Sequence, residues 1–325
     1  MMNQVKTIGV LTSGGDAPGM NAAVRAVVRS AVEFNIRVLG IRRGYNGLMT
    51  GDIVEMDKRS VSDIIQKGGT ILYTARCLEF KEMAGVQQAA DVARDFGIDG
   101  IVVIGGDGSF RGARDLSNLG IPCVGVPGTI DNDIVCTDYT IGFDTACNIA
   151  MEAVDRLRDT SQSHERCSVV EVMGRRAGHL ALDVGVATGA IAAIVPEKEY
   201  DLESDICGKI LEGQRTGKNH HLVIVAEGYP GGGEKVAEVI QRVTGIDTRL
   251  TVLGHIQRGG RPTVMDRVNA TRMGYRAVDL LRKGIGNRIV AIKSNDVVDF
   301  DITEGLAMSK SIDHKLCEIC RAVSK

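Results

Sequence analysis

The sequence has no tryptophan and few aromatic residues of any kind. Phe, Trp and Tyr make up 4% of its 325 residues, so it lacks the stacking surfaces with which proteins bind single-stranded nucleic acid. Charge of neither sign is in excess: 39 Lys and Arg oppose 41 Asp and Glu, for a formal net charge of −2. Neither nucleic acid nor a membrane surface is therefore an expected partner, and any anionic ligand must be held by local groups of arginines.

Long apolar stretches are missing as well. No run is long enough to cross a bilayer, and the opening MMNQVKTIGVLT lacks the apolar core of a secretory signal. The eight cysteines are scattered, and only Cys317 and Cys320 have the CxxC spacing of a redox or metal pair. No second ligand pair follows them, so two small residues of a helix are the simpler interpretation. The remaining thiols are typical of a reducing compartment, and we expect a cytoplasmic protein.

The chain does contain a regular alternation of strand and helix patterns. The chain has more residues than a single hydrophobic core usually supports, which indicates two domains. Short runs rich in β-branched residues alternate with amphipathic stretches, which predicts an α/β fold with mainly parallel sheets flanked by helices. Strands are expected at 7–12, 37–41, 100–106, 122–128, 168–174, 191–196, 221–228 and 251–256, and helices at 20–34, 83–96, 145–160, 201–213, 234–243 and 263–283. Such sheets bind ligands at the carboxyl ends of their strands, where nearly every unusual polar motif of this sequence lies.

Two glycine-rich motifs each follow an expected strand. In SGGDAPGMN, at 13–21, the glycines let a ligand approach the backbone, and the next helix offers free N–H groups to a phosphate. A purely structural turn is the alternative. In IGGDGS, at 104–109, Asp107 could hold Mg²⁺ among backbone groups that surround phosphates, or it could cap a helix at 109–118. This second motif also resembles the loop of NAD kinases and diacylglycerol-type kinases, so by itself it indicates the class of kinases and not one particular enzyme.

The third motif, PGTIDND at 127–133, is a dense polar cluster that also follows a strand. Asp131 and Asp133 stand two residues apart, beside Thr129 and Asn132. A carboxylate here can accept the proton of a hydroxyl that attacks phosphorus, and a second carboxylate can act through metal-bound water. The alternative is a turn rich in Asx residues.

The fourth motif, RLTVLGHIQRGGRPTVMDR at 249–267, surrounds a strand end with Arg249, His255 and Arg258. Guanidinium groups match the geometry of phosphate oxygens. Any one of these arginines alone is typical of a solvated surface charge, but their coincidence with strand ends favours a sugar phosphate and a nucleotide as ligands. Further arginines in loops or at strand ends are Arg76, Arg166 and Arg175.

In this order and spacing, SGGDAPGMN, GGDGS, PGTIDND, VEVMGR and LGHIQRGG closely resemble bacterial ATP-dependent 6-phosphofructokinases over essentially the whole chain. The resemblance implies a glycolytic enzyme that transfers a phosphoryl group from ATP to the 1-hydroxyl of fructose 6-phosphate, giving fructose 1,6-bisphosphate and ADP. It also implies the phosphofructokinase-type fold, with the active site in the cleft between two domains. The larger, ATP-binding domain would be 1–141 plus 256–306, and the smaller, sugar-phosphate-binding domain 142–255 plus 307–325.

The resemblance also implies roles for single residues. The nucleotide would contact Gly15, Arg76, Cys77, Gly106, Asp107, Gly108 and Ser109, with Asp107 as the residue that holds Mg²⁺. Asp131 would be the catalytic base, with Thr129 and Asp133 beside it, and Arg175 would stabilise the transferring phosphoryl group. The sugar phosphate would contact Thr129, Ile130, Asp131, Arg166, Met173, Gly174, Arg175, Glu227, Arg249, His255 and Arg258. Arg166 and Arg249 would reach in from a neighbouring subunit, so a homotetramer is expected.

Two other functions stay open on the sequence. Pyrophosphate-dependent relatives usually carry Asp at the position of Gly108 and Lys at that of Gly128. Both residues are small here, which leaves room for a nucleotide and supplies no extra cation for pyrophosphate. A non-catalytic α/β module that senses a ligand is the other alternative, although it would not need the set of Asp107, Asp131 and Arg175.

A second anion site, for ADP or phosphoenolpyruvate between subunits, is also implied by the resemblance. Its matching positions are Arg25, Arg29, Lys58, Arg158, Gly189 and Lys218, with Lys58 where relatives carry Arg. Arg25 and Arg29 lie four residues apart, and like charges at that spacing cost a helix about 0.2–0.5 kcal/mol, which suits a site that awaits an anion. Two solvated arginines are the alternative. Thr216 stands where many relatives have a phosphate-binding Lys, and Ile191 where they have a metal-binding acid, so we expect weak regulation.

Overall fold

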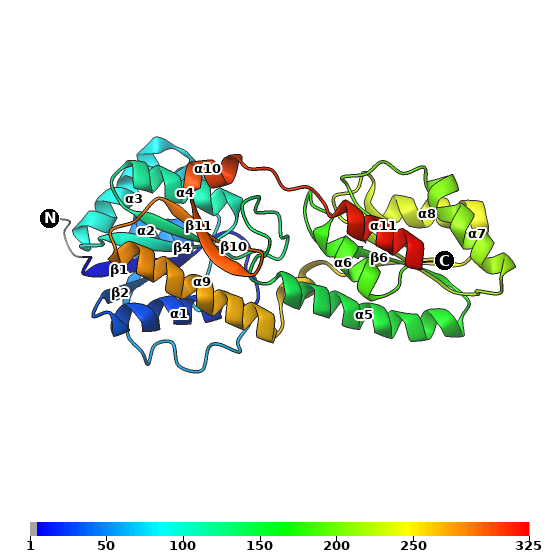
Figure 1. The fold of residues 1–325 in the computed structure, drawn as a ribbon, viewed down its shortest axis with the longest axis horizontal. Coiled ribbons are helices and arrows are strands. Elements are labelled where there is room, and N and C mark those ends of the chain that lie inside the picture. The colour runs from blue at the N-terminus through cyan, green and yellow to red at the C-terminus, as the bar shows by residue number, and fades with distance from the viewer. Residues whose placement is uncertain (1–4, 325) are drawn as a thin grey trace. The chain divides into compact units, whose positions relative to one another are not determined.

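The structure is a computed structural model that describes residues 5–324, and these separate into two compact units (Figure 1). The larger unit consists of residues 5–130, Ile134–Thr145 and Arg258–Lys310, and the smaller of Asp131–Asp133, Ala146–Gln257 and residues 311–324. Each unit has its own sheet and its own helices. In the part of the chain that the structure describes, no helix has both the length and the apolar character needed to cross a membrane.

The sheet of the larger unit has seven strands in the order β11-β10-β5-β4-β1-β2-β3. Its inner strands are parallel to one another, whereas the edge strands β3 and β11 pair antiparallel with β2 and β10. The strands are β1 Thr7–Thr12, β2 Arg37–Ile41, β3 Ile53–Met56, β4 Gly100–Gly105, β5 Cys123–Pro127, β10 Arg288–Lys293 and β11 Asp296–Asp301.

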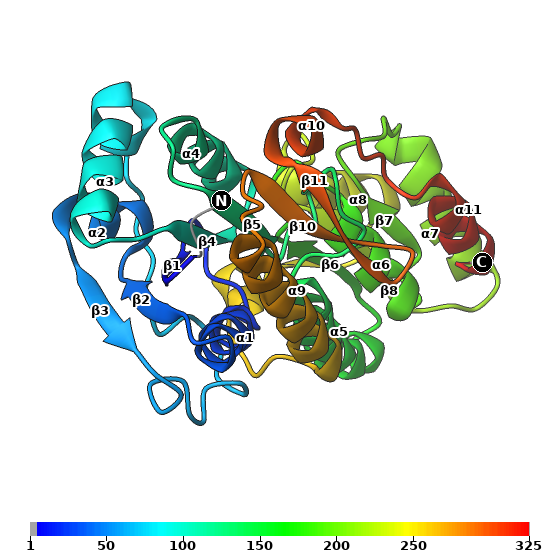
Figure 2. The same cartoon turned by 60° about the vertical axis from the view of Figure 1, so that its left-hand side comes forward.

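Helices cover both faces of this sheet (Figure 2). Helices α1 and α9 lie side by side on one face, and the second group packs on the other. The members of the first group are α1 Met20–Glu33 and α9 Val264–Arg282, and those of the second are α2 Gly44–Thr50, α3 Met83–Asp95, α4 Asp107–Asn118 and α10 Ile302–Ala307. A short 3₁₀ helix, η1 Glu79–Lys81, precedes α3.

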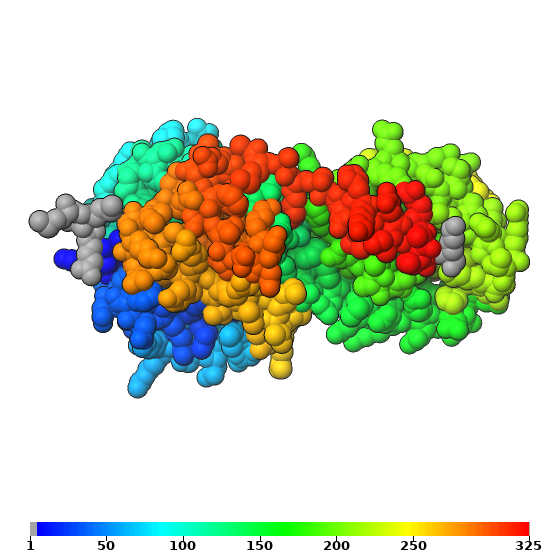
Figure 3. Space-filling model, in the orientation of Figure 1, coloured from blue at the N-terminus to red at the C-terminus, as the bar shows by residue number. Residues whose placement is uncertain are grey.

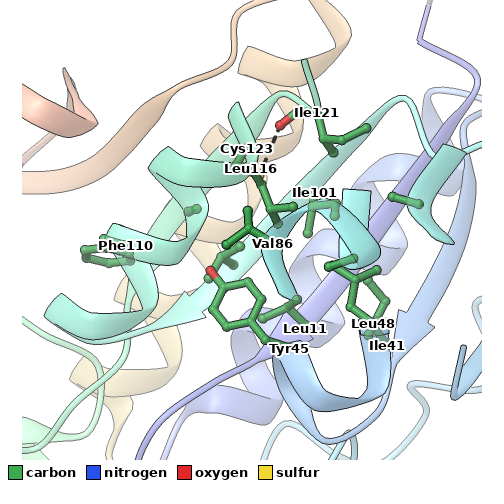
Figure 4. Packing of buried hydrophobic residues seen from close by; sticks show 14 of the residues in the cluster. Leu11, Ile41, Tyr45, Leu48, Val86, Ile101, Phe110, Leu116, Ile121 and Cys123 are labelled. Carbon is green, nitrogen blue, oxygen red and sulfur yellow. Dashed lines mark hydrogen bonds between the residues drawn. The ribbon is translucent and has the colours of Figure 1, made fainter. Parts of the chain in front are cut away.

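The hydrophobic core under the second group of helices supports one of the predicted ligand loops (Figure 4). Strand and helix side chains that meet there are Leu11, Ile41, Ile101, Leu48, Val86 and Leu116. The Tyr45 ring stacks on Phe80 with its centroid 4.0 Å away, and its hydroxyl donates a hydrogen bond to the carbonyl of Ser109. Burial raises the pKa of Tyr45 well above its usual value, so its hydroxyl stays protonated and donates to the 106–109 loop at Ser109.

The smaller unit contains a four-stranded parallel sheet in the order β7-β8-β6-β9. Its strands are β6 Cys167–Val172, β7 Ala192–Ile194, β8 His221–Ala226 and β9 Thr248–Val252. Its helices are α5 Phe143–Ser163, which begins in the larger unit, α6 His179–Ala187, the π-helical η2 Leu202–Cys207, α7 Gly208–Arg215, α8 Gly232–Thr244, the 3₁₀ turn η3 Gly254–Arg258 and α11 His314–Val323. The last helix, α11, lies on the surface of this unit and appears red in Figure 3.

The α/β fold with two mainly parallel, helix-flanked sheets is confirmed, and the differences concern single strands. The strand predicted at 251–256 lies at Thr248–Val252, because Gly254 adopts a φ of 54° and the chain turns into η3. Strands β3, β10 and β11 were not predicted. Two of these three are edge strands, which bury fewer side chains and so have a weaker apolar pattern.

A buried histidine makes the stability of the smaller unit depend on pH. His221 begins β8 with 1% of its surface exposed, and burial, helped by Lys218 and His220, lowers its pKa from 6.5 to about 4. The unfolded chain therefore binds this proton more readily, so its contribution to stability is complete above pH 6.5 and is lost as the pH falls towards 4. We expect β8 to lose about 2–3 kcal/mol of local stability near pH 4.5.

Hydrogen exchange of the β8 amides measures this loss in the intact protein. His221→Leu removes the titrating group, so the variant should show a shallower decline in protection than the native protein between about pH 7 and pH 4.5. Carboxylates titrate in the same range in both proteins and cancel in the comparison. Parallel declines would assign the acid sensitivity to groups other than His221.

Candidate active site

Three of the predicted polar motifs meet at one edge of the larger sheet. Strands β5, β4 and β1 are parallel neighbours, so their carboxyl ends, and the loops that follow them, lie together. The backbone N–H of Ser13 donates to the carbonyl of Ile104 at 2.9 Å, and that of Gly128 donates to Gly105 at 2.9 Å. The motifs at 13–21, 104–109 and 127–133 are thus joined through their first residues.

Close packing explains two of the glycines in these loops. A Cβ atom on Gly105 would lie 2.5 Å from Ser109 Oγ and from the Ser13 carbonyl, and one on Gly15 would lie 2.7 Å from Arg258 Nη1. The backbone carbonyl at Gly105 leaves room for glycine alone, whereas at Gly15 the end of the Arg258 side chain would have to move. Arg258 also donates to the carbonyl of Asp16 at 3.1 Å, so the structure places this arginine against the first glycine loop of the larger unit.

Asp107 is the first residue of α4, directly after the cap residue Gly106. The alternative that Asp107 caps the helix is wrong, because its side chain forms no capping hydrogen bond and instead accepts from Arg111 Nε at 2.9 Å and Nη2 at 3.3 Å. This ion pair raises the pKa of Arg111. Arg111 was not predicted from the sequence, although its spacing of four residues from Asp107 in a helix would have indicated an ion pair.

The surroundings of Asp107 fit a magnesium ion that is shared with a phosphate ligand. Its carboxylate is half-exposed at a loop of backbone N–H groups, and Mg²⁺ is commonly held by one or two carboxylates together with substrate phosphates and water. Among residues 5–324 no group of three or more His, Cys, Asp or Glu side chains could hold a metal by itself. Asp107 would therefore depend on ligand oxygens for the rest of the coordination shell.

The two small residues that bear on the phosphoryl donor have different surroundings. A Cβ on Gly108 would meet no atom within 4 Å, so this position opens into free space. A Cβ on Gly128 would lie 3.1 Å from Ile104 Cγ2 and 3.2 Å from Met20 Cε. Gly128, directly after β5, is thus packed against side-chain ends, whereas Gly108 is not; that both positions leave room for a nucleotide stays a prediction.

In the smaller unit the predicted base and the predicted phosphoryl-stabilising arginine are in contact. The carboxylate of Asp131 is buried, and its Oδ2 lies 3.2 Å from Nε of Arg175. The Arg175 side chain is 60% exposed, so most of its guanidinium group stays accessible. Both Asn132 and Arg175 have positive φ values, 49° and 54°. Such backbone strain at non-glycine residues concentrates at functional sites.

Two side chains fix the turn that carries Arg175. Glu227 Oε1 accepts from the backbone N–H of Gly174 at 3.2 Å and of Arg175 at 2.8 Å. Gln257 is fully buried, and its Oε1 accepts from the N–H of Met173 at 2.8 Å. Glu227 was expected at the sugar and Gln257 was not singled out, although it lies within the LGHIQRGG motif. Both orient the backbone on either side of Gly174.

Arg166 and Arg249 share one carboxylate in the smaller unit. Asp247 Oδ2 lies 2.6 Å from Arg166 Nε, and Oδ1 lies 3.1 Å from Arg249 Nε. The pairing of β6 with β9 places Ser168 opposite Arg249, which explains why these neighbouring segments converge. The hydrogen bond from Arg166 is the largest cause of a lowered pKa at Asp247. No sequence pattern pointed to Asp247, whose carboxylate contacts both of these predicted phosphate-binding arginines.

The remaining predicted site residues fall into three classes of environment. Thr129, Ile130 and Met173 are buried, Cys77 and Asp133 are half-buried, and Arg76 and His255 are exposed. The Thr129 carbonyl accepts from Thr140 Oγ1 at 2.6 Å, which fixes the chain just before Asp131. Cys77 packs against the core of the larger unit with its Sγ 3.5 Å from Met49 Sδ.

The predicted effector residues divide between the units. On α1, Arg25 and Arg29 are half-buried, and burial followed by the charge of Arg29 lowers the pKa of Arg25. Lys58 pairs with Glu33 at 3.3 Å. In the smaller unit Arg158 donates to the carbonyl of Thr188, Gly189 has a φ of 60° and Lys218 is half-buried. Ile191 is 4% exposed within the hydrophobic core of that unit.

One buried carboxylate of the larger unit was missed altogether. Asp266, on α9, accepts hydrogen bonds from Gly142 N at 2.6 Å and Thr145 N at 2.9 Å, and from the hydroxyls of Tyr139 and Thr145. Burial raises its pKa even against these donors. Asp266 therefore holds the segment that leads into α5. The aspartate closes the fourth motif, but nothing in that motif names its partners.

Comparison with known proteins agrees with this arrangement. Residues 7–281 match the family model described as Phosphofructokinase. The chain is 59% identical over 321 residues to an ATP-dependent 6-phosphofructokinase of Clostridium botulinum (strain Loch Maree / Type A3), covering 99% of this chain and 100% of the relative. It is 57% identical over 320 residues to one of Clostridium novyi (strain NT), covering 98% of this chain and 100% of the relative.

A solved structure extends the likeness to three dimensions. Phosphofructokinase from Saccharomyces cerevisiae superimposes with a TM-score of 0.88 at 36% sequence identity. The match covers 93% of this chain and 45% of the yeast chain, so this chain spans less than half of that longer protein. Matched over most of its length by the family model and by close relatives, the chain belongs to the phosphofructokinase family.

Proposed function

We propose that the chain transfers the γ-phosphoryl group of ATP to the 1-hydroxyl of fructose 6-phosphate, as a step of glycolysis in the cytoplasm. The observation that carries the proposal is the buried carboxylate of Asp131 with Arg175 Nε 3.2 Å from it. A base beside a phosphate-binding guanidinium is the pair that attack of a hydroxyl on phosphorus requires. A module that only senses a ligand has no use for such a pair.

Each proposed role follows from a group already described. Asp131 takes the proton of the attacking hydroxyl, and Arg175 offers N–H donors to the charge that spreads over the transferred phosphoryl oxygens. Glu227 and Gln257 keep the backbone around Arg175 in place. Arg166 and Arg249, gathered by Asp247, bind the 6-phosphate. Bound Mg²⁺, which Asp107 would hold, supplies further charge neutralisation.

The direct test is a coupled assay with fructose 6-phosphate, in which ATP and pyrophosphate are compared as donors in the presence of Mg²⁺. We expect turnover with ATP and little or none with pyrophosphate. Binding of both substrates without turnover would favour the ligand-sensing alternative. Turnover with pyrophosphate alone would favour the pyrophosphate-dependent one.

Gly108→Asp tests why ATP is the donor. The position opens into free space, so the added carboxylate fits the fold and places a negative charge beside bound phosphates. Like charges brought together cost several kcal/mol, so kcat/KM for ATP should fall about 10²-fold. Gly108→Ala is the matched control, because it adds a Cβ without charge. Equal ATP kinetics in the two variants would remove Gly108 as a determinant of the donor.

We also propose that the active protein is a homotetramer with a weakened effector site. Ile191 lies in an apolar core and cannot coordinate the metal ion of a nucleotide effector, and Thr216 offers no charge. One missing charge-assisted hydrogen bond corresponds to about 1.5–3 kcal/mol, or a 10- to 100-fold loss of effector affinity. The half-saturation point for fructose 6-phosphate should therefore move less than about threefold with Mg-ADP or phosphoenolpyruvate at about 1 mM. A large shift that Arg25→Ala abolishes would show that the site still regulates.

A further inference from the structure

The smaller unit contains a cavity that none of the predicted catalytic residues lines. It encloses about 130 Å³ between β7, the segment after it, η2, α7 and the C-terminal helix α11. Helix α11 packs against α6 and β7, and so forms one wall. Of the positions expected to matter for effectors, only the altered Ile191 contributes, as part of the apolar side.

Positive charge dominates the rim of this cavity. Lys198, Lys209 and Arg321 contribute three cationic groups, against the single carboxylate of Asp205. Asp205 Oδ2 accepts from the backbone N–H of Asp201 at 3.0 Å and so is bound within its own turn. Among residues 5–324, none of the three cations forms an ion pair. The lining therefore carries an excess of positive charge, which the carboxylate of Asp205 offsets only in part.

The cations also act on one another. Lys209 is half-buried, and its pKa is lowered first by burial and next by the positive charge of Arg321, with a smaller effect of Lys198. Groups brought together in this way raise the free energy of the empty site, and an anion between them would lower it. This arrangement is unlike that of the paired cations elsewhere in the unit, such as Arg166 with Asp247.

The rest of the cavity lining is largely apolar. It includes Ile191, Ala192 and Leu182, together with the side chain of Tyr200. The Tyr200 hydroxyl donates to the carbonyl of Ala193 at 3.1 Å, and Lys198 Nζ lies 4.8 Å from the ring centroid. A ligand that fits must therefore combine a strong anion with at most a short carbon skeleton.

We propose that this cavity is a binding site for a small phosphate compound, lined neither by the predicted catalytic residues nor by Arg25 or Arg29 of α1. The Arg321 fork suits two phosphate oxygens, and the two lysines supply point charges. Its volume of about 130 Å³ is close to that of the engineered cavity of about 150 Å³ that accepts benzene, so it has room for inorganic phosphate or a phosphate monoester of a few carbons.

Cys317 provides a local reporter, because it lines the cavity and is half-buried. Its rate of alkylation by iodoacetamide is measured by mass spectrometry with inorganic phosphate, with glycerol 1-phosphate, and with sodium chloride at the same ionic strength. Labelling follows the unoccupied fraction of sites, so a probe at ten times its Kd should slow Cys317 about tenfold. Cys147, half-buried on α5 and outside the cavity, should label at an unchanged rate.

The two phosphate probes distinguish the source of the anion. If both probes protect Cys317 equally, inorganic phosphate is sufficient for binding. If only the monoester protects it, the carbon skeleton contributes to binding. The double variant Lys209→Gln with Arg321→Gln should lose the protection, Lys209→Arg should keep it, and Lys235→Gln, an exposed lysine outside the cavity, is the matched control. Comparing rates with and without probe in each variant corrects for changes in basal labelling.

The proposal fails if the probes leave Cys317 labelling unchanged, if chloride protects equally, or if the double variant is still protected. Turnover of fructose 6-phosphate in the double variant should match that of the native protein, which also verifies that the variant is folded. Because turnover and Cys317 protection are separate readouts, failure of this site is distinguishable from failure of the proposed function.

Discussion

Replacing Asp131 by asparagine is expected to lower kcat by about 10²–10⁴-fold, with a much smaller change in KM for fructose 6-phosphate. Asparagine keeps the shape of a side chain that is fully buried, but it cannot accept the proton of the attacking hydroxyl. The loss thus falls on an interaction that forms only in the transition state. Steady-state kinetics with ATP measure both constants.

The control for this substitution is Asp155→Asn, an exposed carboxylate on α5. Thermal unfolding of both variants shows whether the buried site tolerates the amide, since the amide leaves Arg175 without its charged partner. A folded Asp131→Asn protein with near-normal kcat would contradict the role of Asp131 as base. A rise in KM with unchanged kcat would contradict it equally, because it would assign Asp131 to ground-state binding.

Local sequence signals were sufficient to predict where the polar motifs lie. The strands expected at 7–12 and 100–106 are present as β1 and β4, with the two glycine loops directly after them. Buried parallel strands form continuous apolar runs that end in glycine, so the pattern is strong and local. That these loops also meet follows from strands β1, β4 and β5 being neighbours, and no local pattern encodes that order.

Side chains that form hydrogen bonds with residues far away in the sequence had no such local pattern. Gln257 bonds to Met173, 84 residues earlier, and Asp266 bonds to Tyr139, 127 residues earlier. The side chains were visible in the fourth motif, but their partners depend on how α9 and β6 are placed in their units. The surroundings of Gly128 could not be predicted either. The sequence shows that the residue is small, but only the structure shows that Met20 and Ile104 pack against it.

Edge strands were missed for a related physical reason. Strand β11 has the sequence DVVDFD, in which charged residues interrupt the apolar ones, and its residues are only half-buried or exposed. Its Asp299 is nevertheless tied to Arg276 at 2.7 Å and to Arg288 at 2.7 Å. The pairing with β10 and these ion pairs compensate for a weak pattern, and both become visible only in three dimensions.

Replacing Arg175 by lysine is expected to lower kcat about 10²–10³-fold, which is the effect of removing one preorganised donor from a developing oxyanion. Lysine keeps the charge but cannot present the planar fork of N–H groups. The side chain is 60% exposed while Nε lies against Asp131, so the two Nη groups remain for the phosphoryl oxygens. Arg176→Lys, at the exposed neighbouring residue, is the matched control.

The backbone at Arg175 decides how this substitution should be interpreted. Its φ of 54° is strained for any side chain, so lysine and alanine variants keep the strain, and a glycine variant would relieve it and alter the turn. Lysine is therefore the informative change. If Asp131 and Arg175 act as one coupled unit, the double variant with Asp131→Asn should lose far less than the product of the two single losses. Losses that multiply fully would mean that the two residues contribute independently, and their contact at 3.2 Å would then not couple them in catalysis.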